Sequence, residues 1–240
     1  MQFTLTYIVG LGNELEYRRY LQTEIHLFEC DGDGRVKALI NTVTGSRIGQ
    51  VLDVGCGAGQ ELLPFLERGA SLGVGIDVQP AAGEVFRELF AERGFGERAV
   101  FIQTAGEALP FGDETYDLVI CRVALPYMRC GEALAEMARI MRPGARLILT
   151  VHTPSFYLRM VRERIGTFSP KQLFYPAACF AGGLWYMISG RQPRAGFWKG
   201  KETFHTGSML RRELSRAGLR IESEVPPDGK GGRTFVIVKT

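Results

Sequence analysis

The chain has 240 residues, of which 45% are hydrophobic, and its 29 basic and 26 acidic residues nearly balance. This is enough to bury one large core, so we expect a single domain with an elaboration. Five cysteines without a Cys-x-x-Cys pair argue against a disulfide framework or a zinc cluster, and we expect no metal. They fit a reducing cytoplasm, and the sequence predicts neither a signal peptide nor a membrane-spanning run.

The first 49 residues are expected to form a helical segment. Residues 14–28 predict one helix and residues 35–43 predict another. Residues 31–34, Asp-Gly-Asp-Gly, lack the further acids of a calcium loop, so they predict a plain turn. The side chains expected to face inward from the first helix are Leu15, Tyr20, Leu21, Ile25 and Phe28.

Residues 51–60, Val-Leu-Asp-Val-Gly-Cys-Gly-Ala-Gly-Gln, are the most informative stretch. The short apolar run predicts a buried parallel strand. Gly55, Gly57 and Gly59 then let the backbone turn sharply and approach a ligand closely. The apolar residues that follow have the spacing of one helix face. Together these features predict a nucleotide-type site at the end of a sheet strand.

Two details discriminate among nucleotides. A dinucleotide fingerprint needs Gly-x-Gly-x-x-Gly, but the place of its last glycine, counted from Gly55, holds Gln60. Asp53, just before the turn, would also be a poor neighbour for two phosphates. It suits a ligand with a positive end, and S-adenosylmethionine, with its sulfonium and ammonium groups, is such a ligand.

Asp77 ends a second apolar run, eighteen residues after Gly59. An acid in this place can accept hydrogen bonds from both ribose hydroxyls. Glycine turns and strand-end acids are each common, but the pair at this spacing is a strong signal.

The rest of the chain alternates predicted strands and helices, which implies a parallel, doubly wound α/β sheet. Pro80 is well placed to open a helix that runs to Arg93, and a third strand is predicted at residues 99–104. Later strands are predicted at residues 146–151, 219–225 and 234–238, with helices before Pro143 and Gly218.

With these motifs in this order, the chain resembles the class I S-adenosylmethionine-dependent methyltransferases, in their broad small-molecule, type 11-like group. The similar segments are residues 51–60 (glycine motif), 75–77 (ribose-binding strand), 106–111 (adenine loop), 116–121 (fourth strand) and 141–149 (turn into the fifth strand). The resemblance implies a Rossmann-like, seven-stranded, mostly parallel sheet with an antiparallel last strand between the fifth and sixth positions, and a helical insertion after strand 5.

The same resemblance implies how the single methyltransferase domain, residues 1–240, is divided. Residues 50–152 and 205–240 would form the cofactor-binding core, after the N-terminal helical segment of residues 1–49. Residues 153–204 would be an inserted helical, aromatic and basic acceptor cap.

The resemblance also implies S-adenosyl-L-methionine as the cofactor. The residues expected to contact it are Asp53, Gly55, Cys56, Gly57, Gly59, Asp77, Val78, Gly106, Glu107 and Arg122. One departure from the family pattern is Ala105, where relatives usually have an acid for the adenine amino group. That role is left to backbone groups or to Glu107.

Residues 153–204 break the alternation of strands and helices. They hold eight basic and two acidic residues and eleven aromatics, including both tryptophans, and residues 173–188 carry no charge. Three interpretations compete: a passive cap packed on the sheet, an acceptor lid for an apolar or anionic small molecule, and membrane-surface contact through residues 173–199. Nucleic acid is less favoured, because residues 121–126 lack the motif of base-amine methyltransferases. The expected acceptor-pocket residues are Tyr127, Tyr157, Trp185, Trp198 and His205.

No residue is clearly catalytic, because methyl transfer from a sulfonium has a good leaving group and positioning can supply much of the rate. His152, at the end of the predicted fifth strand, is the candidate base if the acceptor must lose a proton, and a structural role for it is an equal alternative. We expect O- or C-methylation of a small molecule by in-line displacement. The alternatives are a nicotinamide-dependent oxidoreductase, or a non-catalytic module that binds the cofactor or only a protein partner.

Overall fold

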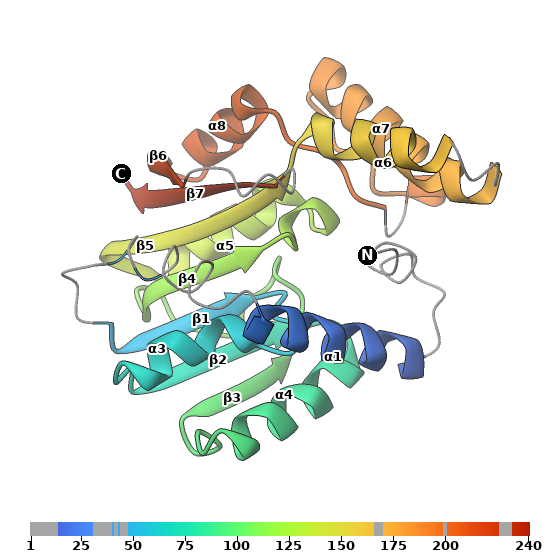
Figure 1. Ribbon diagram of the computed structural model, residues 1–240. Coiled ribbons are helices and arrows are strands. Elements are labelled where there is room, and N and C mark those ends of the chain that lie inside the picture. Colours follow the sequence, from blue (N-terminus) through green and yellow to red (C-terminus); the bar gives the residue numbers. More distant parts are fainter. Residues whose placement is uncertain are drawn as a thin grey trace.

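The computed structural model describes residues 14–30, 40, 43, 48–165, 170–198, 201–225 and 232–240. Figure 1 shows a central sheet with helices on both faces and further helices beyond one end of it. The helix predicted at residues 35–43 and the turn predicted at residues 31–34 lie outside the described residues, apart from residues 40 and 43.

The sheet has seven strands in the order β3-β2-β1-β4-β5-β7-β6. Strands β1 to β5 pair in parallel, whereas β7 pairs antiparallel with both β5 and β6. The predicted fold class is therefore confirmed, including the place of the last strand. The strands are β1 Gln50–Val54, β2 Leu72–Asp77, β3 Ala99–Gln103, β4 Tyr116–Arg122, β5 Met141–His152, β6 Leu219–Val225 and β7 Gly232–Lys239.

The strand order reverses between β1 and β4. From β1 the chain runs outward through β2 to β3 and then crosses back to β4 on the other side of β1. At such a switch point the loops leave the two strands in opposite directions, and ligands of open α/β sheets bind in the crevice between them. The residues at this point are Gly55, after β1, and Arg122, at the end of β4.

Helices bury both faces of the sheet. Neighbouring residues of β4 point to opposite sides, since Leu118 packs with α3 (Leu63–Glu67) and α4 (Pro80–Glu92), and Val119 packs with α5 (Cys130–Ile140) and α8 (Gly207–Arg216). Strands buried on both faces have continuous apolar runs, which explains why their sequences are apolar without alternation.

Two predictions differ from the structure, one on the placement of a side chain and one on the start of a strand. Helix α1 spans Glu14–Cys30 and buries Leu21 and Phe28, but Leu15 is 52% exposed, so its inward placement is wrong. It lies in the first turn, ahead of Leu21, whose side chain packs on Ala82 and Val85 of α4. Strand β5 begins at Met141, earlier than residue 146, because Met141 already pairs with Tyr116 of β4.

The insertion after β5, residues 153–204, is called the cap. It contains α6 (Pro154–Ile165), α7 (Pro170–Ser189) and the short helix η3 (Gly196–Trp198). Figure 1 places α6 and α7 together beyond the end of the sheet to which β5 points. Their contacts form a separate apolar cluster that includes Tyr157, Tyr175 and Phe204. Within the described residues, no helix combines the length and the apolar character needed to cross a membrane.

Candidate functional site

The chain turns sharply after β1 at three glycines. Gly55, Gly57 and Gly59 have φ angles of 71°, 54° and 78°, a region that only glycine adopts without steric cost. The Gly55 N–H donates to the carbonyl of Ile76 at 2.8 Å, which ties the turn to β2. A Cβ on Gly55 would lie 2.2 Å from the Cβ of Ala124, so the turn is also packed tightly against the segment after β4.

Asp77 lies directly beside this turn, at the end of β2. Its Oδ2 accepts from the Gly57 N–H at 3.1 Å, and its Oδ1 accepts from the Gln79 N–H at 2.9 Å. Burial raises the pKa of Asp77, and these backbone donors oppose that shift. Val78, the next residue, is 58% exposed. The structure thus brings the predicted ribose acid and the predicted glycine turn into contact.

Helix α1 covers the same turn. Leu21 packs on it so closely that a Cβ on Gly57 would come within 3.0 Å of the Leu21 Cδ2. Tyr17, one turn earlier, is half-buried near Asp77, and its pKa is raised first by desolvation and then by the charge of Asp77. The sequence predicted α1 but not its contact with the glycine turn, because the two segments are more than thirty residues apart in the chain.

Acidic side chains surround the end of β1 and β4. Asp53 and Glu61 are each 2% exposed. Arg122 donates from Nε to Glu61 at 2.9 Å and lies 3.9 Å from Glu24 of α1. The predicted residues Asp53 and Arg122 therefore share one edge with two further carboxylates. This charge distribution favours a ligand with a positive end.

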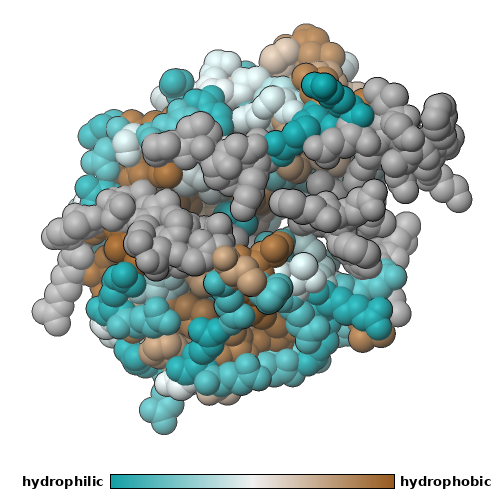
Figure 2. Space-filling view, in the orientation of Figure 1, coloured by the Kyte–Doolittle hydropathy of each residue, from teal (hydrophilic) through white to brown (hydrophobic). Residues whose placement is uncertain are grey.

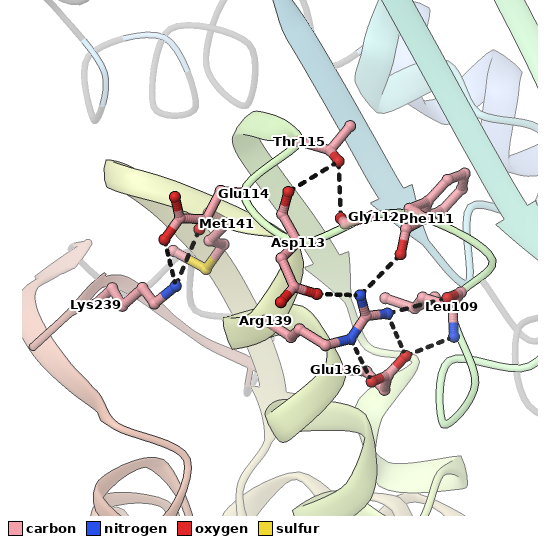
Figure 3. Close-up of polar contacts among 10 residues, drawn as sticks. All are labelled: Leu109, Phe111, Gly112, Asp113, Glu114, Thr115, Glu136, Arg139, Met141 and Lys239. Carbon is pink, nitrogen blue, oxygen red and sulfur yellow. Dashed lines mark hydrogen bonds and ion pairs between the residues drawn. The ribbon is translucent and has the colours of Figure 1, made fainter.

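The loop between β3 and β4 is held by two charged side chains of α5 (Figure 3). Arg139 donates to the carbonyls of Leu109 and Phe111 at 3.1 and 2.8 Å. Glu136 accepts from the Leu109 N–H at 2.9 Å and pairs with Arg139 at 2.8 Å, and Asp113 also pairs with Arg139. These contacts hold the predicted adenine loop through both the N–H and the carbonyl of Leu109.

Gly106 and Glu107 begin that loop and lie against the segment after β4. A Cβ on Gly106 would come within 2.7 Å of the Met128 Sδ, and one on Gly55 would lie 3.6 Å from the Met128 Cε. Glu107 accepts from the Arg129 N–H at 2.7 Å, at the start of α5. Met128 thus contacts both predicted cofactor loops.

A buried carboxylate of the cap that sequence reasoning missed faces the end of the sheet. Glu202 is fully buried, and its Oε1 accepts from Tyr127 at 2.5 Å and from Tyr175 at 3.1 Å. Its Oε2 accepts from Tyr157 at 2.7 Å and from the Nδ1 of His152 at 2.9 Å. These partners are 27 to 75 residues away in the chain, so the sequence around Glu202 carried no local signal.

The hydrogen bonds of this cluster determine which of its groups is ionised. Burial alone would raise the pKa of Glu202, but the hydrogen bonds from His152, Tyr127 and Tyr157 lower it below its ordinary value. Burial and the charge of Glu202 raise the pKa of Tyr127 and Tyr157. The phenols are therefore protonated donors, and Glu202 is the ionised acceptor.

The chain matches a family described as "Methyltransferase domain" over residues 51–144. Residues 51–144 are therefore similar to a methyltransferase domain. The match covers β1 to the start of β5, together with the glycine turn, Asp77 and the loop held by Arg139.

Curated relatives agree with this family. Over 99 residues the chain is 30% identical to a sterol 4-C-methyltransferase of Caenorhabditis elegans, with 41% of this chain and 29% of the other covered. Over 110 residues it is 34% identical to a ubiquinone/menaquinone biosynthesis C-methyltransferase of Hahella chejuensis, with 44% of each covered. The chain spans less than half the length of these relatives.

Solved structures share the fold at low sequence identity. A complex of the Haloferax volcanii Trm112 methyltransferase activator with a methyltransferase gives a TM-score of 0.64 at 17% identity, covering 93% of this chain and 97% of that one. The magnesium protoporphyrin IX methyltransferase of Synechocystis, with bound S-adenosylhomocysteine, gives 0.57 at 19%, covering 97% and 91%. The [4+2]-cyclase SpnF gives 0.57 at 20%, covering 80% and 59%. The methyltransferase fold therefore also occurs in a protein named as a cyclase.

The remaining predicted acceptor residues lie in three different places. Trp185 is 58% exposed on the outer side of α7. Trp198 lies against α7, where a Cβ on Gly182 would come within 2.9 Å of its ring. His205 is buried, with its ring centre 5.8 Å from that of Tyr186. Only Tyr127 and Tyr157 of the five join His152 at Glu202.

Arg194 connects the cap with the segment after β4. It donates to the carbonyls of Pro126 and Met128, after β4, and to that of Lys201 at 2.9 Å. Since Met128 contacts Gly55 and Gly106, these bonds connect the cap with the predicted cofactor loops. Across the parts of the chain that the structure describes, no group of three or more His, Cys, Asp or Glu side chains is arranged to hold a metal ion.

Proposed function

We propose that this chain transfers the methyl group of S-adenosylmethionine to a small-molecule acceptor. The observation that carries the proposal is the contact between Asp77 and the glycine turn at the switch point of the sheet. The bound donor would supply an electrophilic methyl group on a sulfonium. The turn would bring its backbone close to the donor, Asp77 would accept from the ribose hydroxyls, and Asp53 would face the positive end.

A nicotinamide-dependent oxidoreductase fits these residues less well. Gln60 replaces the third glycine on which a pyrophosphate would rest, and the buried acids Asp53 and Glu61 would oppose its charge. A non-catalytic module is also less favoured, because the carboxyl edge of the sheet carries both the glycine turn and the predicted ribose acid.

The five cysteines are free thiols in the structure, which supports a reducing, cytoplasmic compartment.

The acceptor would lie between the carboxyl end of β5 and the cap. His152 and Tyr127 are in this region, and both are joined to the cap by Glu202. The aromatic side chains of α6 and α7 and the basic composition of the cap support an apolar or anionic acceptor, methylated at oxygen or carbon.

The cofactor assignment is tested by calorimetry with S-adenosylhomocysteine and, separately, NAD. We expect micromolar binding of the first and none of the second. Asp77→Ala removes the acceptor of both ribose hydroxyls and should weaken binding by about 2–4 kcal/mol. The control Glu222→Ala removes an exposed acid of β6, on the far side of the sheet, and should change nothing. Equal affinities of wild type and Asp77→Ala would refute the assignment.

We further propose that α7 contacts an anionic membrane surface. Its outward side chains form an uncharged stripe with helical spacing, which includes the exposed Phe174, Leu184, Trp185 and Ile188, and Figure 2 shows apolar surface over this part of the cap. Phe174 also contacts Phe197, above whose ring the Lys201 ammonium lies at 4.1 Å. An apolar stripe beside cations complements anionic headgroups.

Sedimentation with lipid vesicles tests this surface. Binding to vesicles containing phosphatidylglycerol, and not to pure phosphatidylcholine, is expected, and Trp185→Ser should reduce it several-fold. Val100→Ser, which removes an exposed apolar side chain from the edge strand β3, is the matched control. A stable dimer that Trp185→Ser dissociates, without vesicle binding, would assign the stripe to a second copy instead.

A further inference from the structure

We propose that His152 is the general base of the methyl transfer, and that Glu202 is the positioning residue that fixes its tautomer and its ring. This deepens the proposed function, because it rests on the donor binding at the glycine turn. It also assigns an acceptor class, a compound whose reacting hydroxyl, or activated C–H, must lose a proton.

The hydrogen bond to Glu202 determines which nitrogen of His152 is the base. An ionised carboxylate only accepts, so the Nδ1 at 2.9 Å from Glu202 carries the proton. The Nε2 then has a free lone pair, and no hydrogen bond to it is found among the described residues. The ring is held on a second side, since it stacks on Phe156 at 3.7 Å with an interplanar angle of 7°. Both contacts leave the ring in one orientation.

The exposed fractions of the side chains in the cluster single out the same residue. The Glu202 side chain is fully enclosed, whereas the His152 side chain is 12% exposed. The hydroxyls of Tyr127, Tyr157 and Tyr175 all donate to Glu202 and are not available as bases. His152 is thus the basic group through which this buried charge can act on a bound molecule.

His152 also lies at a suitable place in the sheet. In the strand register, Thr150 of β5 is level with Arg122 of β4, and His152 is two residues further toward the carboxyl edge. β5 is two strands from β1, or about 10 Å from the glycine turn across the sheet. This spacing leaves room for an acceptor between the donor and the imidazole.

A purely structural role explains the buried charge less well. Enclosing a carboxylate costs several kcal/mol before its partners compensate, and an apolar side chain of similar size often packs with equal or greater stability. Of the full charges near Glu202, that of Arg194 is engaged by three carbonyls, and that of Lys201 lies over the Phe197 ring. Titratable groups around it are Tyr127 after β4, Tyr157 from α6, and Tyr175 and Cys179 from α7.

The proposed step balances with these groups. The acceptor proton moves to His152 Nε2, and the oxygen or carbon lone pair forms the bond to the methyl carbon. The carbon–sulfur bond breaks with its electron pair remaining on sulfur, which leaves S-adenosylhomocysteine. Glu202 stabilises the imidazolium of His152, which then returns the proton to water.

The first test needs no acceptor. The chain has three histidines, so NMR with isotope-labelled histidine can follow each, with His152→Gln as the assignment variant. In the S-adenosylhomocysteine complex we expect the neutral His152 ring to be the Nδ1–H tautomer. Glu202→Gln should mix the two neutral tautomers, because its amide can donate to the ring as well as accept from it. A protonated Nε2 in the wild type would overturn the proposal.

The second test uses transfer of a labelled methyl group to a panel of simple phenols and their methyl ethers. We expect labelling of phenols only, and a loss of kcat of about 100-fold or more in His152→Gln. Glu202→Gln should lower kcat and shift the acidic limb of its pH profile to lower pH. Glu213→Gln, which changes a buried carboxylate paired with Arg212 and Arg216 of α8, is the matched control.

The outcomes separate the two proposals. Lost S-adenosylhomocysteine binding by the wild type would refute the proposed function. Retained binding with an unchanged pH profile in Glu202→Gln would refute the role of the dyad alone. If Glu202→Gln does not fold, Tyr175→Phe removes the longest of the four hydrogen bonds and should give a smaller shift in the same direction.

Discussion

The predicted cofactor edge, where the glycine turn and Asp77 lie, and the cap are held by different kinds of contact. Around the glycine turn, geometry depends on backbone dihedrals and on space, since a Cβ on Gly55 would collide with Ala124. In the cap and at its attachment, geometry depends on buried polar side chains, with Glu202 and Arg194 as the central groups. The first kind tolerates no added atoms, whereas the second kind tolerates no missing partners.

This difference also shows how the two regions communicate. The cap reaches the cofactor edge through Arg194, whose hydrogen bonds hold the segment that ends in Met128. Met128 in turn packs against Gly55 and Gly106. Among the described residues, this chain of contacts runs through residues 126–128, and we expect the two regions to respond separately to most substitutions.

The largest expected effect is at the glycine turn. Gly57→Val places a β-branched side chain at a φ of 54° and within 3.0 Å of Leu21, so S-adenosylhomocysteine affinity should fall more than about 100-fold, or 2.7 kcal/mol. Calorimetry measures the affinity and circular dichroism the fold. Gly94→Val, at a φ of 73° with open space around it, imposes similar backbone strain elsewhere and should leave the affinity intact. Normal binding by Gly57→Val would mean that the donor does not lie on this turn.

An intermediate effect is expected from pH at the junction of cap and core. Burial lowers the pKa of His205 to about 4, and neither ring nitrogen has a hydrogen-bond partner among the described residues. The unfolded chain takes up this proton near pH 6.5 and the folded chain does not, so stability falls as pH decreases. From about pH 7 to about pH 5 the free energy of unfolding should decrease by about 2 kcal/mol through this residue.

Urea unfolding at the two pH values measures that loss. His205→Leu should abolish most of the pH dependence in this range. His26→Gln, which changes an exposed histidine of α1, should preserve it. The same pH dependence in all three proteins would assign the loss to other groups.

The smallest effect is expected at the loop after β3. Arg139→Gln removes the donors to the carbonyls of Leu109 and Phe111 and should weaken S-adenosylhomocysteine binding about threefold, or 0.6 kcal/mol, by loosening the loop. Arg142→Gln breaks an ion pair with Asp117 at the amino ends of β4 and β5, away from the glycine turn. It should therefore affect stability but not affinity. Equal changes of affinity in both variants would show that Arg139 acts only through general stability.

Much of the core could be predicted because its signals are local. The glycines at positions 55, 57 and 59 announce positive φ angles by their residue type. Pro80 opens α4 as predicted, and the predicted strand at residues 219–225 coincides with β6. Such features depend on dihedral preferences and on periodicity over a few residues, which a single sequence displays directly.

The sequence by itself thus determined the fold class, the glycine turn and the acid that follows it. The tertiary structure decided which polar groups of the cap meet, that Trp185 faces outward and that Leu15 is exposed. Glu202 lies in a basic, aromatic stretch, and only the packing of α6, α7, β5 and the segment after β4 brings His152 and three tyrosines to it. Its partners are set by packing between distant segments, and residue type and spacing along the chain do not encode that meeting.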